Sequence, residues 1–169
     1  MLMDAPPEKE DCVPFVTIDE FFDTNGVRVP HIVAKDLEQG FLLLEDFGDV
    51  LLSTQLDDKT VDAHYEQSFK QLIQLQSIDG EGHFPAYSYE KLMTEMSLLT
   101  DWLLPSLQIQ PSDDESALIK RTFAILANAA LAQPQVIIHR DFHSRNLMLL
   151  ADEQEQGVIC LLYTSDAAD

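Results

Sequence analysis

A short stretch of chemically varied polar residues between two apolar stretches constrains the fold of this chain more than any other feature. Residues 139–146 contain two histidines, two arginines, an aspartate and an asparagine. Val136–Ile138 and Leu147–Leu150 flank them and predict two β-strands. A polar turn at Ala151–Gln156 then leads to a further predicted strand at Gly157–Ile159. Because strands hold the loop between them in place, and functional residues are often carried on such loops, this region predicts a reactive site.

Three amphipathic segments in the middle of the chain predict helices. The first is Val61–Ile78, and the second begins at Ser88 and ends before Pro105. The third opens at Ser112–Glu115, which has the spacing of a capping box, and ends before Pro134. Their apolar residues recur at the helical period, so we expect these residues to pack in the core. They are Val61, Tyr65, Phe69, Leu72, Ile73, Leu75, Leu92, Met93, Met96, Leu99, Leu103, Leu118, Ile119, Phe123, Ile125 and Leu126.

One helix and one β-hairpin are expected before residue 50. The spacing of Thr17–Glu20 is that of a capping box and predicts a helix from Ile18 to about Thr24, with Gly26 as its C-terminal stop. Ile32–Ala34 and Phe41–Glu45 predict a β-hairpin whose connecting turn contains a glycine. Helices and strands therefore mix along the chain, which indicates an α/β (α+β) fold.

The charge of the chain excludes several classes of partner. It has 30 acidic and 10 basic residues, which gives a net charge of -20. Binding to nucleic acid needs a dense surface of Lys and Arg, and an anionic membrane would repel this chain, so neither partner is expected. No apolar run reaches the roughly 18 residues that span a bilayer. Because two cysteines, Cys12 and Cys160, make no disulfide framework, we expect a cytoplasmic protein, and we expect it to be a monomer.

The residue types of the polar loop suit the transfer of a phosphoryl group. This reaction needs a carboxylate that orients the attacking hydroxyl and accepts its proton, and an oxygen donor that helps to hold Mg²⁺ on the phosphates of ATP. Asp141 and Asn146 are of these types, and their separation matches the Asp-x-x-x-x-Asn spacing of kinase catalytic loops. His139 and Arg140 complete the triplet His-Arg-Asp. An alternative is a zinc site made of His139, Asp141 and His143, for which no fourth ligand is evident.

Residues 136–148, taken together, resemble the catalytic loop of the aminoglycoside phosphotransferase and choline kinase superfamily. Most members have His-x-Asp-x-x-x-x-Asn, and the variant His-Arg-Asp-Phe-His-Ser-Arg-Asn found here is more particular. It resembles bacterial kinases that phosphorylate the anomeric hydroxyl of N-acetylmuramate and N-acetylglucosamine in cell-wall recycling. Residues 3–15 and 41–49 resemble the same subgroup, so the similarity extends from about Met3 to Ile159.

The resemblance implies a protein-kinase-like fold with an incomplete N-terminal lobe and a mainly helical C-terminal lobe. Residues 1–49 would form the remnant of the first lobe and the hinge, residues 50–159 the second lobe with the catalytic loop, and residues 160–169 a non-native tail. The implied function is ATP-dependent phosphorylation of a small-molecule substrate, an amino sugar. Phosphorylation of an aminoglycoside or of a choline-type substrate is the alternative within the family.

The resemblance also assigns roles within the polar loop. Asp141 would be the catalytic base and Asn146 a ligand of Mg²⁺. His139 and Arg140 would support the loop rather than react. The implied cofactors are therefore ATP and Mg²⁺.

Residues outside the catalytic pair receive further roles from the resemblance. His143 and Arg145 are candidate contacts to the sugar or the phosphate. Glu20 is a candidate counterpart of the helix glutamate that positions a phosphate-binding residue. The hinge would hydrogen-bond the adenine of ATP through its backbone, and its residues are Leu43, Leu44, Glu45, Asp46 and Phe47.

Departures from the family pattern predict that this chain is an inactive fragment, truncated at both ends. Cys160 stands where the family has a Mg²⁺-binding aspartate, and residues 161–169 do not resemble the family. The residues before the first predicted helix contain one lysine, Lys9, and no glycine. The kinase template needs a phosphate-covering hairpin and a cationic group at that point. A pseudokinase or a non-catalytic binding fragment is therefore the alternative from another functional class.

Overall fold

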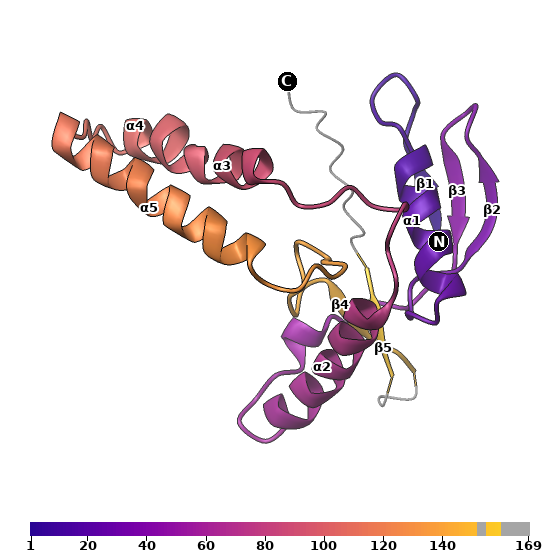
Figure 1. Ribbon diagram of the computed structural model, residues 1–169. Coiled ribbons are helices and arrows are strands. Elements are labelled where there is room, and N and C mark those ends of the chain that lie inside the picture. The colour runs from indigo at the N-terminus through magenta and orange to yellow at the C-terminus, as the bar shows by residue number, and fades with distance from the viewer. Residues whose placement is uncertain (152–154, 160–169) are drawn as a thin grey trace. The chain divides into compact units, whose positions relative to one another are not determined.

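The computed structural model describes residues 1–151 and 155–159 of the chain (Figure 1). Within them the chain forms two compact units. The first joins Met1–Ile78 to the described residues from Ile137 on, and the second is Asp79–Val136. The expected boundary between two lobes, after residue 49, lies inside the first unit. Three residues of the predicted turn 151–156, and the whole of the predicted tail 160–169, lie outside the described residues.

A three-stranded antiparallel sheet begins the first unit. Its strands are β1 (Leu2–Asp4), β2 (Ile32–Asp36) and β3 (Phe41–Leu44), and β3 lies between the other two. The pairing of β2 with β3 confirms the predicted hairpin. The sequence did not predict β1, because three residues followed by Ala5 and two prolines carry no periodic signal.

Gly40 allows the hairpin to turn close to the segment after β1. Its φ is +77°, a left-handed conformation that side chains disfavour. The Gly40 carbonyl accepts a hydrogen bond of 2.9 Å from the Ala5 N–H, and a Cβ on Gly40 would lie 2.0 Å from the Ala5 carbonyl oxygen. Glycine is therefore required here by both conformation and space. The apolar core beside this turn consists of Ala5, Cys12, Val16, Leu42 and Leu44.

Helix α1 (Val13–Thr24) begins earlier than the sequence predicted. The hydroxyl of Thr17 donates to the Val13 carbonyl at 2.8 Å, so Thr17 lies inside the helix and the predicted capping box at Thr17–Glu20 is wrong. The carboxylate of Asp11 instead accepts from the Val13 N–H at 2.9 Å, and a proline in the first turn has no N–H to satisfy. Gly26, at φ +77°, follows the helix and confirms the predicted stop.

Helix α2 (Val61–Ser77) packs against a second hairpin made of β4 (Leu147–Leu149) and β5 (Gln156–Val158). The buried side chain of Gln156 joins the two elements. Its amide nitrogen donates to the His64 carbonyl at 2.9 Å, and its amide oxygen accepts from the Ser68 hydroxyl at 2.8 Å. The helix and both strands confirm the predicted elements, with bounds that differ by one or two residues.

The predicted strand at Val136–Ile138 is wrong. No strand forms there, although Ile137 is buried. Backbone pairing needs a neighbouring strand, and among the described residues β4 and β5 form a two-stranded sheet that does not include this segment. Ile137 thus contributes burial without a ladder of hydrogen bonds, while Val136 and Ile138 are exposed.

The second unit is helical. Its elements are α3 (Tyr89–Leu98), the π-helical turn η2 (Leu99–Leu103), α4 (Leu104–Ser106) and α5 (Asp113–Leu131), and α3 packs against α5 (Figure 1). The Ser88 hydroxyl accepts from the Lys91 N–H at the start of α3, as predicted. Ser112 and Glu115 form the predicted capping box of α5. None of the described helices is long and apolar enough to pass through a lipid bilayer.

Many of the apolar residues expected in the core are exposed. In the second unit Leu118, Ile125 and Leu126 are each more than half exposed, and in α2 Phe69 and Ile73 are exposed as well. The expectation of core packing is therefore wrong for these residues. A helix that packs against one neighbour buries only the stripe that faces it, so apolar residues on its other faces stay exposed.

Candidate active site

Asp141 and Asn146 come together in the loop between Ile137 and β4. The side-chain nitrogen Nδ2 of Asn146 donates to Oδ2 of Asp141 at 2.7 Å and to the Asp141 main-chain carbonyl at 2.9 Å. Asn146 is buried, whereas Asp141 is partly exposed. The amide oxygen of Asn146 takes no part in these two bonds and is a ligand type that Mg²⁺ prefers. The two residues that the spacing linked therefore meet in space.

His143 lies on the other oxygen of the Asp141 carboxylate. Its Nε2 is 3.1 Å from Oδ1 of Asp141, and its Nδ1 accepts a hydrogen bond of 3.1 Å from the Arg145 N–H. Because Nδ1 acts as the acceptor, a neutral His143 carries its proton on Nε2, where it donates to Asp141. The carboxylate is thus held by two donors from its own loop and keeps one fixed orientation.

His139 and Arg140 lie at the start of the loop. His139 is buried, with its Nε2 3.2 Å from the Ile159 carbonyl oxygen and its ring edge-on to Phe142 at 5.8 Å between centroids. Burial lowers the pKa of His139, so the ring is neutral at pH 7. Arg140 has φ +69°, a left-handed conformation that costs a non-glycine residue about 1–2 kcal/mol. The surrounding contacts of the loop must offset this cost.

The segment after β3 docks directly on the loop. The Ser53 N–H, in the 3₁₀-helix η1 (Leu52–Thr54), donates to the Ser144 carbonyl at 2.9 Å. Leu51 forms an isolated β-bridge with Met148, and the Leu149 N–H donates to the Val50 carbonyl at 2.9 Å. These bonds place residues 50–54 against both the loop and β4. The segment that follows β3 is therefore anchored to the loop that carries Asp141.

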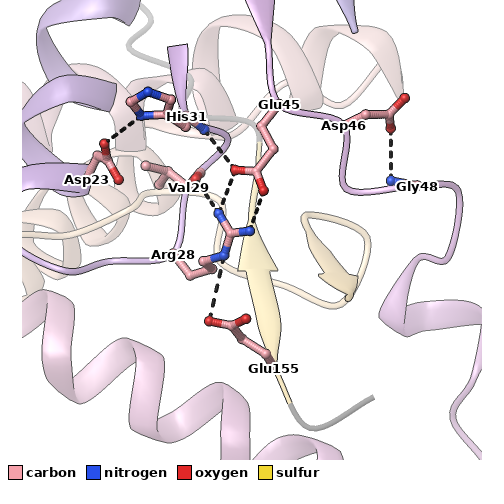
Figure 2. Close-up of polar contacts among 8 residues, drawn as sticks. All are labelled: Asp23, Arg28, Val29, His31, Glu45, Asp46, Gly48 and Glu155. Atoms are coloured by element: carbon pink, nitrogen blue, oxygen red, sulfur yellow. Dashed lines mark hydrogen bonds and ion pairs between the residues drawn. The ribbon is translucent and has the colours of Figure 1, made fainter. Parts of the chain in front are cut away.

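The five residues of the predicted hinge lie at the end of β3 and just beyond it. Leu44 is buried, and its N–H donates to the Met1 carbonyl, while the Glu45 N–H donates to the His31 carbonyl, both at 2.8 Å. Leu43 pairs within the sheet, opposite Leu2 and Ala34. Beyond the strand, the carboxylate of Asp46 accepts from the Gly48 N–H at 2.9 Å (Figure 2). The main-chain N–H groups of Leu44 and Glu45 therefore already donate hydrogen bonds within the fold.

A pocket opens on one side of this segment. Its wall includes Glu45–Val50, the residues Lys59, Thr60, Ala63 and His64 around the start of α2, and Leu149–Ala151 at the end of β4 and just beyond it. Asp141 and Asn146 are not among its lining residues. The pocket thus shares the predicted hinge with the candidate site but does not contain the paired loop residues.

Asp19, in α1, is a notable residue that the sequence patterns did not indicate. Its side chain is 1% exposed, and neither carboxylate oxygen has a hydrogen-bond partner among the described residues. Burial, with Asp23 and Glu20 nearby, raises its pKa from 3.8 to about 7. Its neighbour Glu20, the residue that the resemblance favoured, instead forms an exposed ion pair of 2.5 Å with Lys35. The helical position of Asp19 between Val16 and Phe22, both buried, was the available signal.

The zinc alternative is wrong for the described residues, where no group of three or more His, Cys, Asp or Glu side chains is placed to hold a metal ion. His139 contacts the Ile159 carbonyl and His143 contacts Asp141, so the three candidate ligands do not converge. Cys160, the position expected to hold a metal-binding aspartate, lies outside the described residues.

Two comparisons by sequence bear on these residues. The family model described as the phosphotransferase enzyme family matches residues 1–159. An N-acetylmuramate/N-acetylglucosamine kinase of Pseudomonas aeruginosa is 41% identical over 160 residues, which are 94% of this chain and 47% of that protein. A kinase of the same name from Pseudomonas putida is 36% identical over 149 residues, or 88% of this chain and 44% of that protein. The chain thus spans about half the length of these relatives.

Solved structures share the fold. An aminoglycoside phosphotransferase of Streptomyces rimosus, in complex with ADP and streptomycin, matches with a TM-score of 0.59 and 15% identity over 95% of this chain and 63% of that one. A second such enzyme, in a ternary complex with streptomycin and ATP, matches with a TM-score of 0.57 and 20% identity over 90% of this chain and 56% of that one. The predicted protein-kinase-like fold is therefore confirmed. Together with the match of the family model along residues 1–159, this leads to one conclusion: the chain belongs to the phosphotransferase enzyme family.

Proposed function

We propose that this chain carries the catalytic loop and hinge of an ATP-dependent kinase that phosphorylates N-acetylmuramate and N-acetylglucosamine. The observation that carries the proposal is the meeting of Asp141 with Asn146 in a loop docked on the segment after β3. A relative that is 41% identical bears the name of this kinase. A role in the recycling of cell-wall sugars in the cytoplasm follows from such a substrate.

The reaction would use Asp141 as the base. Its carboxylate accepts the proton of the anomeric hydroxyl while that oxygen forms a bond to the γ-phosphorus of ATP, and the bond from phosphorus to the bridging oxygen of ADP breaks. The donors on its two oxygens, from His143 and Asn146, fix the direction in which the carboxylate faces. Such positioning is a large part of catalysis in phosphoryl transfer.

The cofactors are ATP and Mg²⁺. Mg²⁺ on the phosphates offsets charge on the transferring group, and the amide oxygen of Asn146 would be one of its ligands. The adenine would bind the hinge through the backbone of Asp46 and Phe47, because the amides of Leu44 and Glu45 are bonded within the fold. Arg145 is kept as a candidate contact to the substrate.

A chimeric enzyme tests the proposal. Residues 1–159 of this chain replace the segment that they match in the Pseudomonas aeruginosa relative, and phosphorylation of N-acetylmuramate and N-acetylglucosamine is measured with ATP and Mg²⁺. We expect turnover, and we expect Asp141→Asn in the chimera to lower kcat by about 10²–10⁴-fold, because the base is lost. Asp58→Asn, an exposed carboxylate far from the loop in sequence, is the matched control and should leave kcat unchanged.

Substrate choice is tested by the same chimera. Phosphorylation of kanamycin or choline, without phosphorylation of either amino sugar, would contradict the proposed substrate. Full activity of the Asp141→Asn chimera would contradict the proposed base.

A second proposal concerns the chain as printed, which we expect to bind nucleotide without efficient transfer. Its basis is Cys160, in a position where the family resemblance implies a Mg²⁺-binding aspartate. A thiol is a poor ligand for Mg²⁺, which prefers oxygen. A cysteine placed at position 160 of the chimera should therefore lower kcat by at least about 10²-fold while ATP still binds. Equal kcat values with aspartate and with cysteine at position 160 of the chimera would contradict this proposal.

A further inference from the structure

Arg28 joins three segments of the first unit and was not singled out by any sequence pattern. It lies in the connection between α1 and β2. Its side chain is about one third exposed and points toward Glu45, at the end of β3 (Figure 2). The residues that it contacts come from the predicted hinge and from the β4–β5 hairpin.

The first contact is a two-bond pair with Glu45. The guanidinium nitrogens Nη1 and Nη2 donate to Oε2 and Oε1 of Glu45 at 2.7 and 2.5 Å (Figure 2). The hydrogen bond to Arg28 holds the pKa of Glu45 below its usual value, so the carboxylate stays charged at neutral pH. Such paired bonds fix orientation as well as distance.

The second contact is with Phe47, two residues further along the hinge. The guanidinium carbon lies 4.5 Å from the centroid of the Phe47 ring, within the range of a cation–π interaction. The same ring fills the space beside Gly157 of β5, where an added Cβ would lie 2.2 Å from a ring carbon. Phe47 is therefore held by Arg28 and by the backbone of the hairpin.

The third contact reaches the hairpin that follows the catalytic loop. The Arg28 carbonyl accepts a hydrogen bond of 2.8 Å from the Val158 N–H. The side-chain Nε of Arg28 lies 3.7 Å from Oε1 of Glu155 (Figure 2). One residue thus binds Glu45 and Phe47 on the hinge side and Val158 and Glu155 on the hairpin side. The hinge cannot shift along the hairpin without breaking contacts of Arg28.

We propose that Arg28 is a positioning residue for nucleotide binding, which holds the backbone of Asp46 and Phe47 where the adenine meets it. The inference rests on the proposed function and adds a residue that would not touch the nucleotide itself. A lysine would keep the charge but lose the planar two-bond fork and the flat contact with Phe47. Arg28 should therefore be only partly replaceable by lysine.

The test measures the Kd of ATP with Mg²⁺ for the chain as printed, by isothermal titration calorimetry. We expect Arg28→Met and Glu45→Gln each to raise this Kd by about tenfold, and the double variant to be no weaker than either single variant. Arg28→Lys should give an intermediate Kd. Arg121→Met, on an exposed arginine of α5, is the matched control and should bind as the unaltered chain does.

Hydrogen exchange separates positioning from general loss of structure. In Arg28→Met the amides of Asp46 and Phe47 should exchange faster, while those of Leu42 and Leu44 inside β3 keep their rates. If Arg28→Met fails to fold, the Kd and the exchange rates are compared between the unaltered chain and the variants Glu45→Gln and Arg28→Lys instead. Unchanged Kd values in all three variants would overturn the inference and leave the proposed function standing. A failure of the unaltered chain to bind ATP would contradict the proposed function and the inference with it.

Discussion

Single side chains in this molecule are placed by local rules, but their chemistry depends on contacts from elsewhere. Asp141 and Asn146 are five residues apart, and the loop conformation alone brings them to 2.7 Å. His139 differs, because its burial and its contact with the Ile159 carbonyl come from a segment 20 residues away. Asp19 differs further, since its position between Val16 and Phe22 on the buried face of α1 is the only local signal of a buried carboxyl group among the described residues.

Asp19 predicts a dependence of stability on pH. Its pKa is about 7 in the folded chain, against an ordinary value of 3.8. Between these pKa values the unfolded chain releases the proton of Asp19 while the folded chain keeps it. The contribution of Asp19 to the free energy of unfolding therefore falls as pH rises from about 4 to about 7 and then stays level. Asp19→Asn cannot ionise, and should remove most of this slope.

Urea unfolding at about pH 5 and about pH 8 measures the effect. Asp19→Asn should lose less stability than the unaltered chain between these two conditions. Asp58→Asn, an exposed carboxylate, is the control and should keep the original slope. An identical slope in Asp19→Asn and in the unaltered chain would show that the carboxyl group is not buried as described.

At the scale of elements, turns and caps set where each helix and strand begins. Ser112 and Glu115 open α5 as the sequence predicted, because a capping box satisfies backbone groups within four residues. Helix α1 did not follow its nearest capping pattern, since Asp11 and a first-turn proline provided an earlier start. Where two local starts compete, the pattern alone does not choose between them.

Gly40 and Gly48 allow a matched test of turn geometry. Both have positive φ, at +77° and +79°, but a Cβ would meet the Ala5 carbonyl at Gly40 and nothing within 4 Å at Gly48. Gly48→Ala should cost about 1–2 kcal/mol from the left-handed conformation alone. Gly40→Ala should cost more, because β1 must also move away from the turn.

Urea unfolding of the two variants at one pH gives the comparison. The difference between Gly40→Ala and Gly48→Ala reports the steric contact with Ala5, since the backbone conformation is nearly the same. Equal losses of stability would mean that the segment after β1 moves away from the turn at no cost, and that β1 contributes little to the free energy of unfolding.

At the scale of the whole molecule, burial is distributed unevenly between the two units. Almost all of the buried apolar residues of the described chain lie in the first unit, and Ala127 is the fully buried apolar residue of Asp79–Val136. Local opening is easiest where few apolar contacts must be broken. The helical unit should therefore open at lower free energy than the unit that carries the candidate site.

Native-state hydrogen exchange tests this expectation. Amides in the middle of α5 should have lower protection factors, which correct for intrinsic exchange rates, than those of β3 and of α2. Binding of ATP with Mg²⁺ should slow exchange in the first unit, because a ligand stabilises the state that binds it. Protection in α5 equal to that in β3 would contradict the uneven distribution.

The sequence by itself determined most of the elements and the pairing of Asp141 with Asn146. Helical period, capping residues and the spacing of the loop are signals within a few residues, and their consequences are equally local. The resemblance of residues 136–148 also placed the chain in its family before any contact was known.

Only the tertiary structure decided which side chains are buried and which distant segments meet. Phe69 and Ile125 carry the periodic signal of core residues yet are exposed, because burial depends on what packs against a helix. Val136–Ile138 has the residues of a strand, but no strand of the described residues pairs with it. Arg28 meets Glu45, 17 residues away, and the hairpin at Val158, far along the chain. Such contacts leave no local pattern, since the folded chain alone brings these partners within reach.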